Sequence, residues 1–260
     1  MGEEKAQNQY RGRLAPTPSG YLHEGNMKTF HKAVERAHQV NGMIALRLDD
    51  LDRSRCKQKF IDACYRDLQR EGLSWDEGPL IGGEYGPYVQ SYRNNLYMDA
   101  LLKLKEKGMI YPCERSRSEI KSAGMKSRFG DEYLFPKELS TQKNEREEGE
   151  FPGNTNWRFA TNWGDEVKIV DGRLGEVILE VGLDFSDFLV WRKDGYAAYE
   201  LATVVDDHLM KITEIVRGED LLISSFRQCL LFDSLNWLRP EFFHGELLLA
   251  SNGLKLSKTV

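Results

Sequence analysis

Several patterns that define common protein classes are absent from this chain of 260 residues. No apolar run approaches the roughly 20 residues that a membrane-spanning helix needs. The first residues, MGEEKAQNQY, lack the apolar core of a signal peptide. The four cysteines are scattered, with no CxxC pair and no spacing typical of a disulfide framework. We therefore expect a cytoplasmic protein that has no membrane partner.

The usual motifs for phosphate and metal sites are missing as well. The chain has no P-loop and no GxGxxG motif. The stretch His23–Met27 is not a zinc-protease HExxH motif, because Met27 occupies the position of the second histidine. The net charge of −5 does not indicate nucleic-acid binding, although a local basic face would suffice for it. Any phosphate site in this chain must be built in another way.

The most informative stretch is residues 13–26, with the sequence RLAPTPSGYLHEGN. A short apolar strand runs into a proline-rich turn, and a helical pattern of apolar residues begins just after His23 and Gly25. The unpaired N–H groups and partial positive charge of a helix N-terminus favour an anion. His23 can donate to a phosphate oxygen, and Gly25 allows a ligand to approach the backbone. The alternative is a proline-rich turn that opens an ordinary helix.

Apolar periodicity predicts alternating strands and helices before residue 114. Gly42 and Gly72 follow the first two helical patterns, where a glycine commonly ends a helix. Such alternation implies a parallel sheet covered by helices, which is an α/β fold. The expected strands are 11–15, 43–48 and a short one around Ile110, and the expected helices are 24–41, 57–71 and 92–107.

The pattern changes after Cys113. Residues 114–150 are polar and rich in charge, and short β-like runs separated by glycine and aspartate follow up to residue 182. Alternation of strands and helices then resumes. The expected later strands are 188–191, 212–216 and 247–250, and the expected helices are 196–204 and 221–235. The expected organisation is a tail at 1–10, a first half of the sheet domain at 11–113, an inserted α+β subdomain at 114–184, a second half at 185–245, and a terminal loop region at 246–260.

Four stretches of the chain, taken in order, resemble the glutamyl branch of the class I aminoacyl-tRNA synthetases. HEGN resembles the HIGH-type signature of that class, and KLSKT at 255–259 resembles its KMSKS-type loop. Between them lie LRLDDLDRSR at 46–55 and YAAYELATVVDDHLMKITEIVRGEDLL at 196–222. The resemblance spans nearly the whole chain. It implies a Rossmann-like catalytic domain whose insertion, 114–184, binds the acceptor RNA.

The resemblance also implies an ATP site that works with Mg²⁺. His23 and Gly25, with Asn26 beside them, would bind the ATP phosphates and stabilise charge at the α-phosphorus, which is electrostatic catalysis. Lys255, Ser257 and Lys258 would hold the departing pyrophosphate. Taken alone, such a pattern is more often a solvated lysine pair.

A pocket for glutamate is implied in the same way. Arginine suits the substrate's carboxylates because its planar fork binds them bidentately. For Arg217, the alternative is a surface ion pair with Glu219 or Asp220. Asp49 stands where the family usually has glutamate, and Thr203 where many members have asparagine. The pocket residues implied by the resemblance are Arg13, Ala15, Thr17, Asp49, Tyr199, Thr203 and Arg217.

Two further features select a branch of the family. The sequence stops one residue after KLSKT, whereas discriminating glutamyl enzymes continue into a helical anticodon-binding region. This favours the short glutamyl-queuosine tRNA(Asp) synthetase branch, which activates glutamate and transfers it to queuosine in tRNA(Asp). Many members hold zinc through a CxC pair, but here Glu114 and Arg115 follow Cys113, so we expect no zinc. Asp206, Asp207 and His208 are expected to form a buried hydrogen-bond cluster and not a metal site.

Two other functions stay open from the sequence. The first is a ligase that activates an amino acid for an acceptor other than tRNA, which the departures at Asp49 and Thr203 would allow. The second is a catalytically inactive paralogue that binds tRNA or a nucleotide. In each case we expect a monomer, because no large apolar interface pattern is evident.

Overall fold

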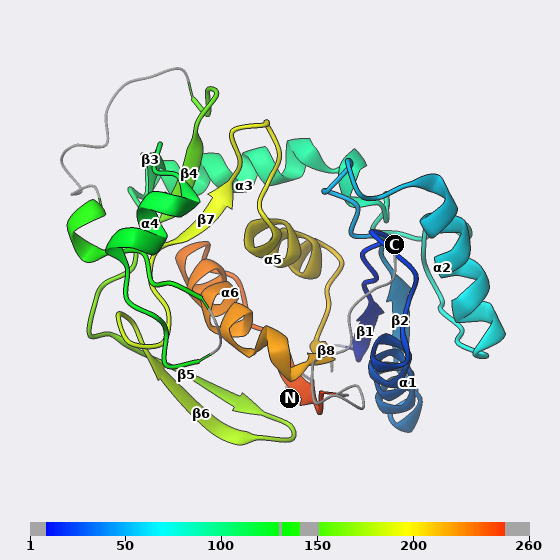
Figure 1. Ribbon diagram of the computed structural model, residues 1–260. Helices are drawn as coiled ribbons and strands as arrows, with labels where there is room; N and C mark the ends of the chain where they lie inside the picture. The colour runs from blue at the N-terminus through cyan, green and yellow to red at the C-terminus, as the bar shows by residue number, and fades with distance from the viewer. Residues whose placement is uncertain (1–8, 130–131, 141–150, 248–260) are drawn as a thin grey trace, which may run out of the picture. The chain divides into compact units, whose positions relative to one another are not determined.

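The computed structural model describes residues 9–129, 132–140 and 151–247 (Figure 1). These residues form two compact units, each assembled from separate segments of the chain. The first unit takes in 9–92, 209–219 and 240–247, and the second takes in 93–208 and 220–239. The expected domain boundaries at 114 and 184 stay a prediction.

The first unit is built on parallel strands. β1 (Arg11–Leu14) pairs in parallel with β2 (Met43–Leu46), and β8 (Glu214–Gly218) pairs in parallel with β9 (Glu241–Gly245). The backbone N–H of Thr213, just before β8, donates to the carbonyl of Arg11 at 2.9 Å. This confirms the expected α/β fold with parallel strands.

Helix α1 (Glu24–Gln39) connects β1 to β2 and packs against β1, β2 and β8 (Figure 1). Its buried face carries Phe30, Ala33, Val34 and Ala37, which recur at the three- and four-residue spacing of one helix face. This face meets the side chains of the buried strands in one apolar core. A second helix, α2 (Gln58–Arg70), adds its own buried stripe.

The second unit holds a three-stranded antiparallel sheet and a hairpin. The sheet has the order β3 (Ile110–Cys113), β4 (Asn156–Phe159) and β7 (Phe188–Trp191), and the hairpin joins β5 (Glu166–Asp171) to β6 (Gly175–Glu180). Its helices are α3 (Asn94–Glu106), α4 (Arg117–Ala123), α5 (Tyr199–Leu209) and α6 (Leu222–Ser234). None of the helices in the described parts of the chain is long and apolar enough to cross a membrane.

Two elements differ from the expectation. The helix expected at 196–204 begins at Tyr199 and continues to Leu209, because residues 196–198 pair with the end of β7 instead. The strand expected at 247–250 lies almost entirely outside the described residues. A strand that the sequence did not reveal, β9, occupies Glu241–Gly245 and alternates exposed and buried side chains.

Candidate nucleotide and amino-acid site

His23 caps the first turn of α1. Its Nδ1 accepts the backbone N–H of Asn26 at 3.3 Å, and the Asn26 side chain accepts the backbone N–H of His23 at 3.2 Å. Because Nδ1 is the acceptor, the neutral imidazole carries its proton on Nε2 and donates through that atom. A donor at a helix N-terminus, where the helix dipole is positive, suits a phosphate oxygen.

The turn between β1 and α1 lies against the extension of β2. The backbone N–H of Arg47 donates to the carbonyl of Leu14 at 2.8 Å, and that of Asp49 donates to Pro16 at 3.0 Å. Along this turn, half-buried Ala15 and Thr17 alternate with buried Pro16. Ala15 and Thr17 therefore share one side of the extended chain.

The side chain of Arg13 reaches the backbone of β8 next to Arg217. Nη1 of Arg13 donates to the carbonyl of Val216 at 2.9 Å, next to Arg217 in the chain. Arg217 is 4% exposed, and its guanidinium lies over the ring of Phe242 at 5.4 Å. It is therefore a buried residue, and not the surface residue that the alternative supposed. Open parallel sheets place ligands at the carboxyl ends of their strands.

The acidic residues after β2 are each held by a partner in the first unit. Asp49 pairs with Arg47 through contacts of 2.6 and 3.2 Å. The carboxylate of Asp50 accepts the backbone N–H and the hydroxyl of Ser91, at 2.8 and 2.7 Å. Hydrogen bonds from Ser54 and then Arg55 lower the pKa of Asp52, although partial burial opposes this. The segment is a set of oriented carboxylates and not a loose polar loop.

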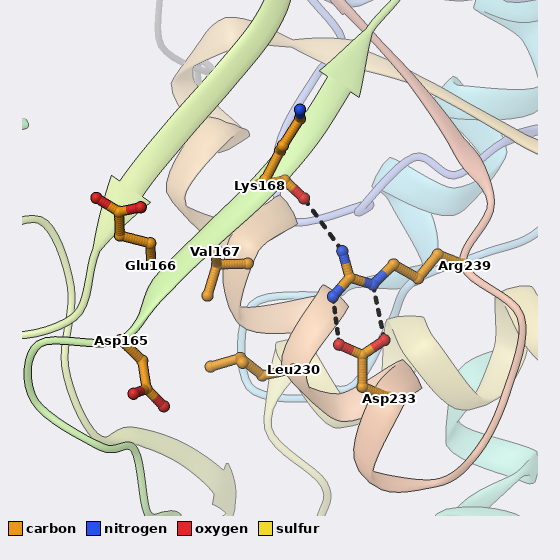
Figure 2. A pocket seen from close by; sticks show the side chains of 7 residues that line it. All are labelled: Asp165, Glu166, Val167, Lys168, Leu230, Asp233 and Arg239. Carbon is orange, nitrogen blue, oxygen red and sulfur yellow. Dashed lines mark hydrogen bonds and ion pairs between the residues drawn. The ribbon is translucent and has the colours of Figure 1, made fainter.

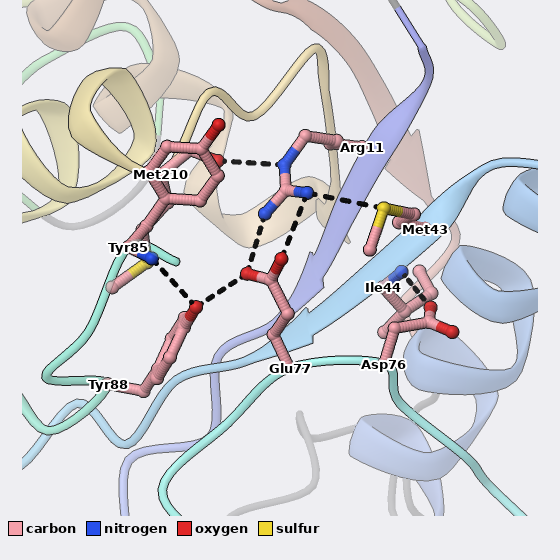
Figure 3. A network of polar contacts seen from close by, with 8 residues as sticks. All are labelled: Arg11, Met43, Ile44, Asp76, Glu77, Tyr85, Tyr88 and Met210. Atoms are coloured by element: carbon pink, nitrogen blue, oxygen red, sulfur yellow. Dashed lines mark hydrogen bonds and ion pairs between the residues drawn. The ribbon is translucent and has the colours of Figure 1, made fainter. Parts of the chain in front are cut away.

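A buried network holds the loop that follows β2 and α2 (Figure 3). Glu77 accepts hydrogen bonds from Arg11 at 2.8 and 3.3 Å and from the hydroxyl of Tyr88 at 2.5 Å. Burial raises the pKa of Glu77, but these hydrogen bonds outweigh it and the pKa is lowered. Burial, and then the bond to Glu77, raise the pKa of Tyr88 to about 12. Gly83 has φ +146°, and a Cβ there would lie 2.3 Å from the Tyr88 hydroxyl, so the loop needs a glycine at this point.

The second unit contains the other two residues expected in the amino-acid pocket. Tyr199, the first residue of α5, is 40% exposed. Thr203 lies one turn later and is fully buried, and its Oγ1 has no hydrogen-bond partner among the described residues. Burying a hydroxyl without a hydrogen-bond partner costs free energy of folding. The hydroxyl of Thr203 therefore lowers the stability of the protein.

The expected hydrogen-bond cluster near the end of α5 is confirmed for Asp206. This fully buried carboxylate accepts from Nε of Arg93 at 2.6 Å and from the hydroxyl of Tyr97 at 2.9 Å. His208 stacks on Trp237 with 3.9 Å between ring centroids. Within residues 9–129, 132–140 and 151–247, no group of three His, Cys, Asp or Glu side chains could hold a metal ion.

An open pocket of about 350 Å³ lies in the second unit, between β5 and the end of α6 (Figure 2). Arg239 forms its wall, pairing with Asp233 and donating to the carbonyl of Lys168 at 3.1 Å. None of the residues expected in the site lines this pocket. Lys255, Ser257 and Lys258 lie outside the described residues, so their expected roles stay predictions.

The first unit is a parallel α/β unit whose first helix begins with a histidine cap, and such a helix start in an open α/β protein suits a nucleotide or another anion. The sequence comparison then gives the family, because the family described as "tRNA synthetases class I (E and Q), catalytic domain" matches residues 9–259. The chain belongs to this family, and it is a ligase of the aminoacyl-tRNA synthetase type.

Individual relatives agree with this assignment. The glutamyl-Q tRNA(Asp) synthetase of Symbiobacterium thermophilum is 41% identical over 95% of this chain and 77% of its own length. Glutamate–tRNA ligase 1 of Fervidobacterium nodosum is 36% identical over 96% of this chain and 54% of its own length. The crystal structure of a glutamate-tRNA synthetase from Elizabethkingia anophelis matches 96% of this chain and 52% of its own with a TM-score of 0.81 at 25% identity. The chain thus spans about half the length of the glutamate–tRNA ligases that it matches.

Proposed function

We propose that the chain activates glutamate with ATP and transfers it to the queuosine base of tRNA(Asp). The observation that carries this proposal is the 41% identity to a glutamyl-Q tRNA(Asp) synthetase over three quarters of that protein. Longer glutamate–tRNA ligases match too, but at lower identity and over only about half of their length. Glutamate, ATP and tRNA are therefore the proposed substrates.

In the proposed first step, a carboxylate oxygen of glutamate attacks the α-phosphorus of ATP. The new O–P bond forms the mixed anhydride glutamyl-adenylate, and the bond to pyrophosphate breaks. His23 would donate from Nε2 to a phosphate oxygen, and Gly25 and Asn26 in the first turn of α1 would leave room for the phosphates. Such catalysis depends on positioning and electrostatics, and no side chain needs to become a covalent nucleophile.

Recognition of glutamate would rest on opposite charges. Arg13, whose side chain donates to the β8 backbone next to Arg217, and Arg217 itself would bind carboxylates of the amino acid, and Asp49 would bind its α-amino group. Mg²⁺ would be held mainly by the ATP phosphates, as is usual for this ion, because the described residues offer no cluster of three metal ligands. Mg²⁺ would neutralise part of the negative charge of the ATP phosphates.

Zinc is not part of the proposal. Cys113 is buried in an apolar cluster with Tyr111, Ile120 and Phe135, and Glu114 and Arg115 follow it in the chain. Neither of these two residues provides a thiolate or imidazole ligand. In this chain, apolar side chains pack around Cys113, at the position where the resemblance to the family would place a zinc ligand.

ATP–pyrophosphate exchange with each of the twenty amino acids, with and without tRNA, tests the proposal. Glutamate-dependent exchange without tRNA is expected, followed by charging of tRNA(Asp) that contains queuosine. Exchange that requires tRNA would favour an ordinary glutamyl-tRNA synthetase step. Tight ATP binding without exchange would indicate the inactive paralogue.

Two observations favour a second candidate, a ligase with an acceptor other than tRNA. Asp49 is paired with Arg47, and Thr203 offers a buried hydroxyl without a partner among the described residues. Both positions depart from the usual pocket residues of the family. Adenylate formation without charging of any tRNA would support this candidate.

A further inference from the structure

Arg47 and Asp49 form a buried ion pair at the end of β2, inside the first unit. Nε of Arg47 lies 2.6 Å from Oδ1 of Asp49, and its Nη2 lies 3.2 Å from Oδ2. The side chains are 1% and 6% exposed. Residues two apart on an extended chain point to the same face, so one strand end supplies both halves of the pair.

The backbone that carries this pair is fixed from both sides. The N–H of Asp49 donates to Pro16, in the turn that leads to His23. On the other edge, Leu48 exchanges hydrogen bonds of 2.9 and 3.0 Å with the backbone of Tyr88 and Gln90. The main remaining freedom of Asp49 is rotation of its side chain, and the fork of Arg47 restricts that rotation.

We infer that Arg47 is a positioning residue for the amino-acid substrate and acts by fixing the carboxylate of Asp49. This inference rests on the proposed function, in which that carboxylate meets the α-amino group. A carboxylate has two oxygens with about four lone-pair sites, so accepting two bonds from an arginine does not by itself prevent a carboxylate from binding an ammonium group. An aspartate reaches one methylene less far than a glutamate, which makes the direction of its carboxylate decisive.

The fork of the guanidinium is the property that matters. Two parallel N–H···O bonds fix both the position and the plane of a carboxylate, whereas the ammonium group of lysine is a point charge that leaves the plane free. The Arg47→Lys substitution keeps the charge of the pair and removes its geometry. It therefore separates orientation of Asp49 from simple neutralisation of its charge.

The test measures ATP–pyrophosphate exchange by wild type and Arg47→Lys, with separate KM values for glutamate and ATP. The expected result is a glutamate KM raised about tenfold or more, equivalent to about 1.4 kcal/mol. The KM for ATP should stay within about twofold of wild type. A change confined to one substrate is not expected from a general loss of structure.

The matched control is Arg93→Lys in the second unit. Arg93 forms an equally buried pair with Asp206, with the same 2.6 Å contact and side chains 1% and 0% exposed. We expect a lower melting temperature for Arg93→Lys, as for Arg47→Lys, because each substitution weakens a buried ion pair. In Arg93→Lys, however, the KM values for glutamate and ATP should both stay within about twofold of wild type. Two further variants, Asp49→Asn alone and Arg47→Met with Asp49→Asn, avoid leaving the charge of Asp49 buried alone. Both should show the same raised glutamate KM, because Arg47 acts only through Asp49.

An unchanged glutamate KM in Arg47→Lys, or equal rises for glutamate and ATP, would overturn the inference. If Arg47→Lys does not fold, the two Asp49→Asn variants decide, and a wild-type glutamate KM in both, or KM values that differ more than about twofold between them, overturns the inference. If wild type shows no glutamate-dependent exchange, the proposed function itself fails and this inference fails with it. The wild-type measurement therefore separates the two failures.

Discussion

Arg36 on α1 donates two hydrogen bonds, at 2.7 and 2.6 Å, to the carboxylate of Glu214 at the start of β8. The Tyr10 hydroxyl donates to the same carboxylate at 2.6 Å. The Glu214 side chain is 3% exposed and that of Arg36 is 30% exposed. This ion pair holds α1, the helix that His23 caps, against β8, the strand that contains Arg217.

Replacing Arg36 should therefore lower the free energy of unfolding of the protein. Arg36→Met leaves the carboxylate of Glu214 buried without its charged partner, which typically costs about 3–5 kcal/mol. Thermal or urea unfolding measures this loss. Lys32→Met is the control, because Lys32 forms an exposed pair with Glu35, and such a pair contributes about 0–1 kcal/mol. Equal losses in the two variants would contradict the prediction.

Two substitutions at His23 should separate its role as a cap from its role as a donor. Asparagine can cap a helix but has no Nε2, whereas alanine can do neither. His23→Ala should lose about 1 kcal/mol of stability and His23→Asn should lose much less. Both should slow ATP–pyrophosphate exchange more than tenfold, equivalent to about 1.4 kcal/mol of transition-state stabilisation. Near-normal exchange by His23→Asn would exclude a donor role for Nε2.

Tyr88→Phe should weaken the network around Glu77. The hydroxyl that it removes donates to Glu77 and accepts the backbone N–H of Tyr85 at 3.1 Å, and leaving these groups without a partner costs about 1–3 kcal/mol. Denaturant unfolding at neutral pH measures the difference. An exposed tyrosine provides the control, and Tyr92→Phe should change stability little, because Tyr92 is 76% exposed.

The stabilities of wild type and Tyr88→Phe should depend differently on pH in the alkaline range. The pKa of Tyr88 is raised in the folded state to about 12 from an ordinary 10.0, so its contribution is complete below pH 10 and is lost as the pH rises towards 12. The stability advantage of wild type over Tyr88→Phe should shrink across this interval. Melting temperatures of both proteins between pH 9 and 12 test this, and a constant difference would contradict it.

A chelator should leave the stability of the protein unchanged. Helix α4 begins with a capping box in which Ser116 and Glu119 bond reciprocally, and the neighbouring cluster around Cys113 is apolar. Melting curves with and without EDTA, together with the zinc content of the purified protein, test the expectation. Stoichiometric zinc whose removal lowers the melting temperature would show it to be wrong.

Local patterns predicted much of the fold. The strand expected at 188–191 has those bounds as β7, and the expected helices at 24–41, 57–71 and 221–235 appear with small changes at their ends. These segments carry a clear period of apolar residues. Strand β9 was missed because its sequence, EFFHG, is short and places the polar His244 at a buried position and the apolar Phe243 at a less buried one, which hides the alternation.

The environment of the candidate site was less predictable. The motif indicated His23, but the tautomer of its ring follows from a hydrogen bond to Asn26 that only the structure supplies. The pairing of Arg47 with Asp49 is local, yet a buried arginine in a strand is not expected from composition. The contact of Arg11 with Glu77 joins residues 66 positions apart, and no periodicity in the sequence encodes such a distance.

The cap on α1 makes one imidazole ring serve two purposes, so a change in the protonation of that ring alters both at once. A second proton on the His23 ring would take away the acceptor for Asn26 and would also place a positive charge at the start of the helix. Any engineered copy of this helix start would carry the orientation of its Nε2 donor with it, because the bond that begins the helix also aims the ring. The residues His23 to Asn26 thus contain both the hydrogen bond that begins the helix and the ring that this bond orients.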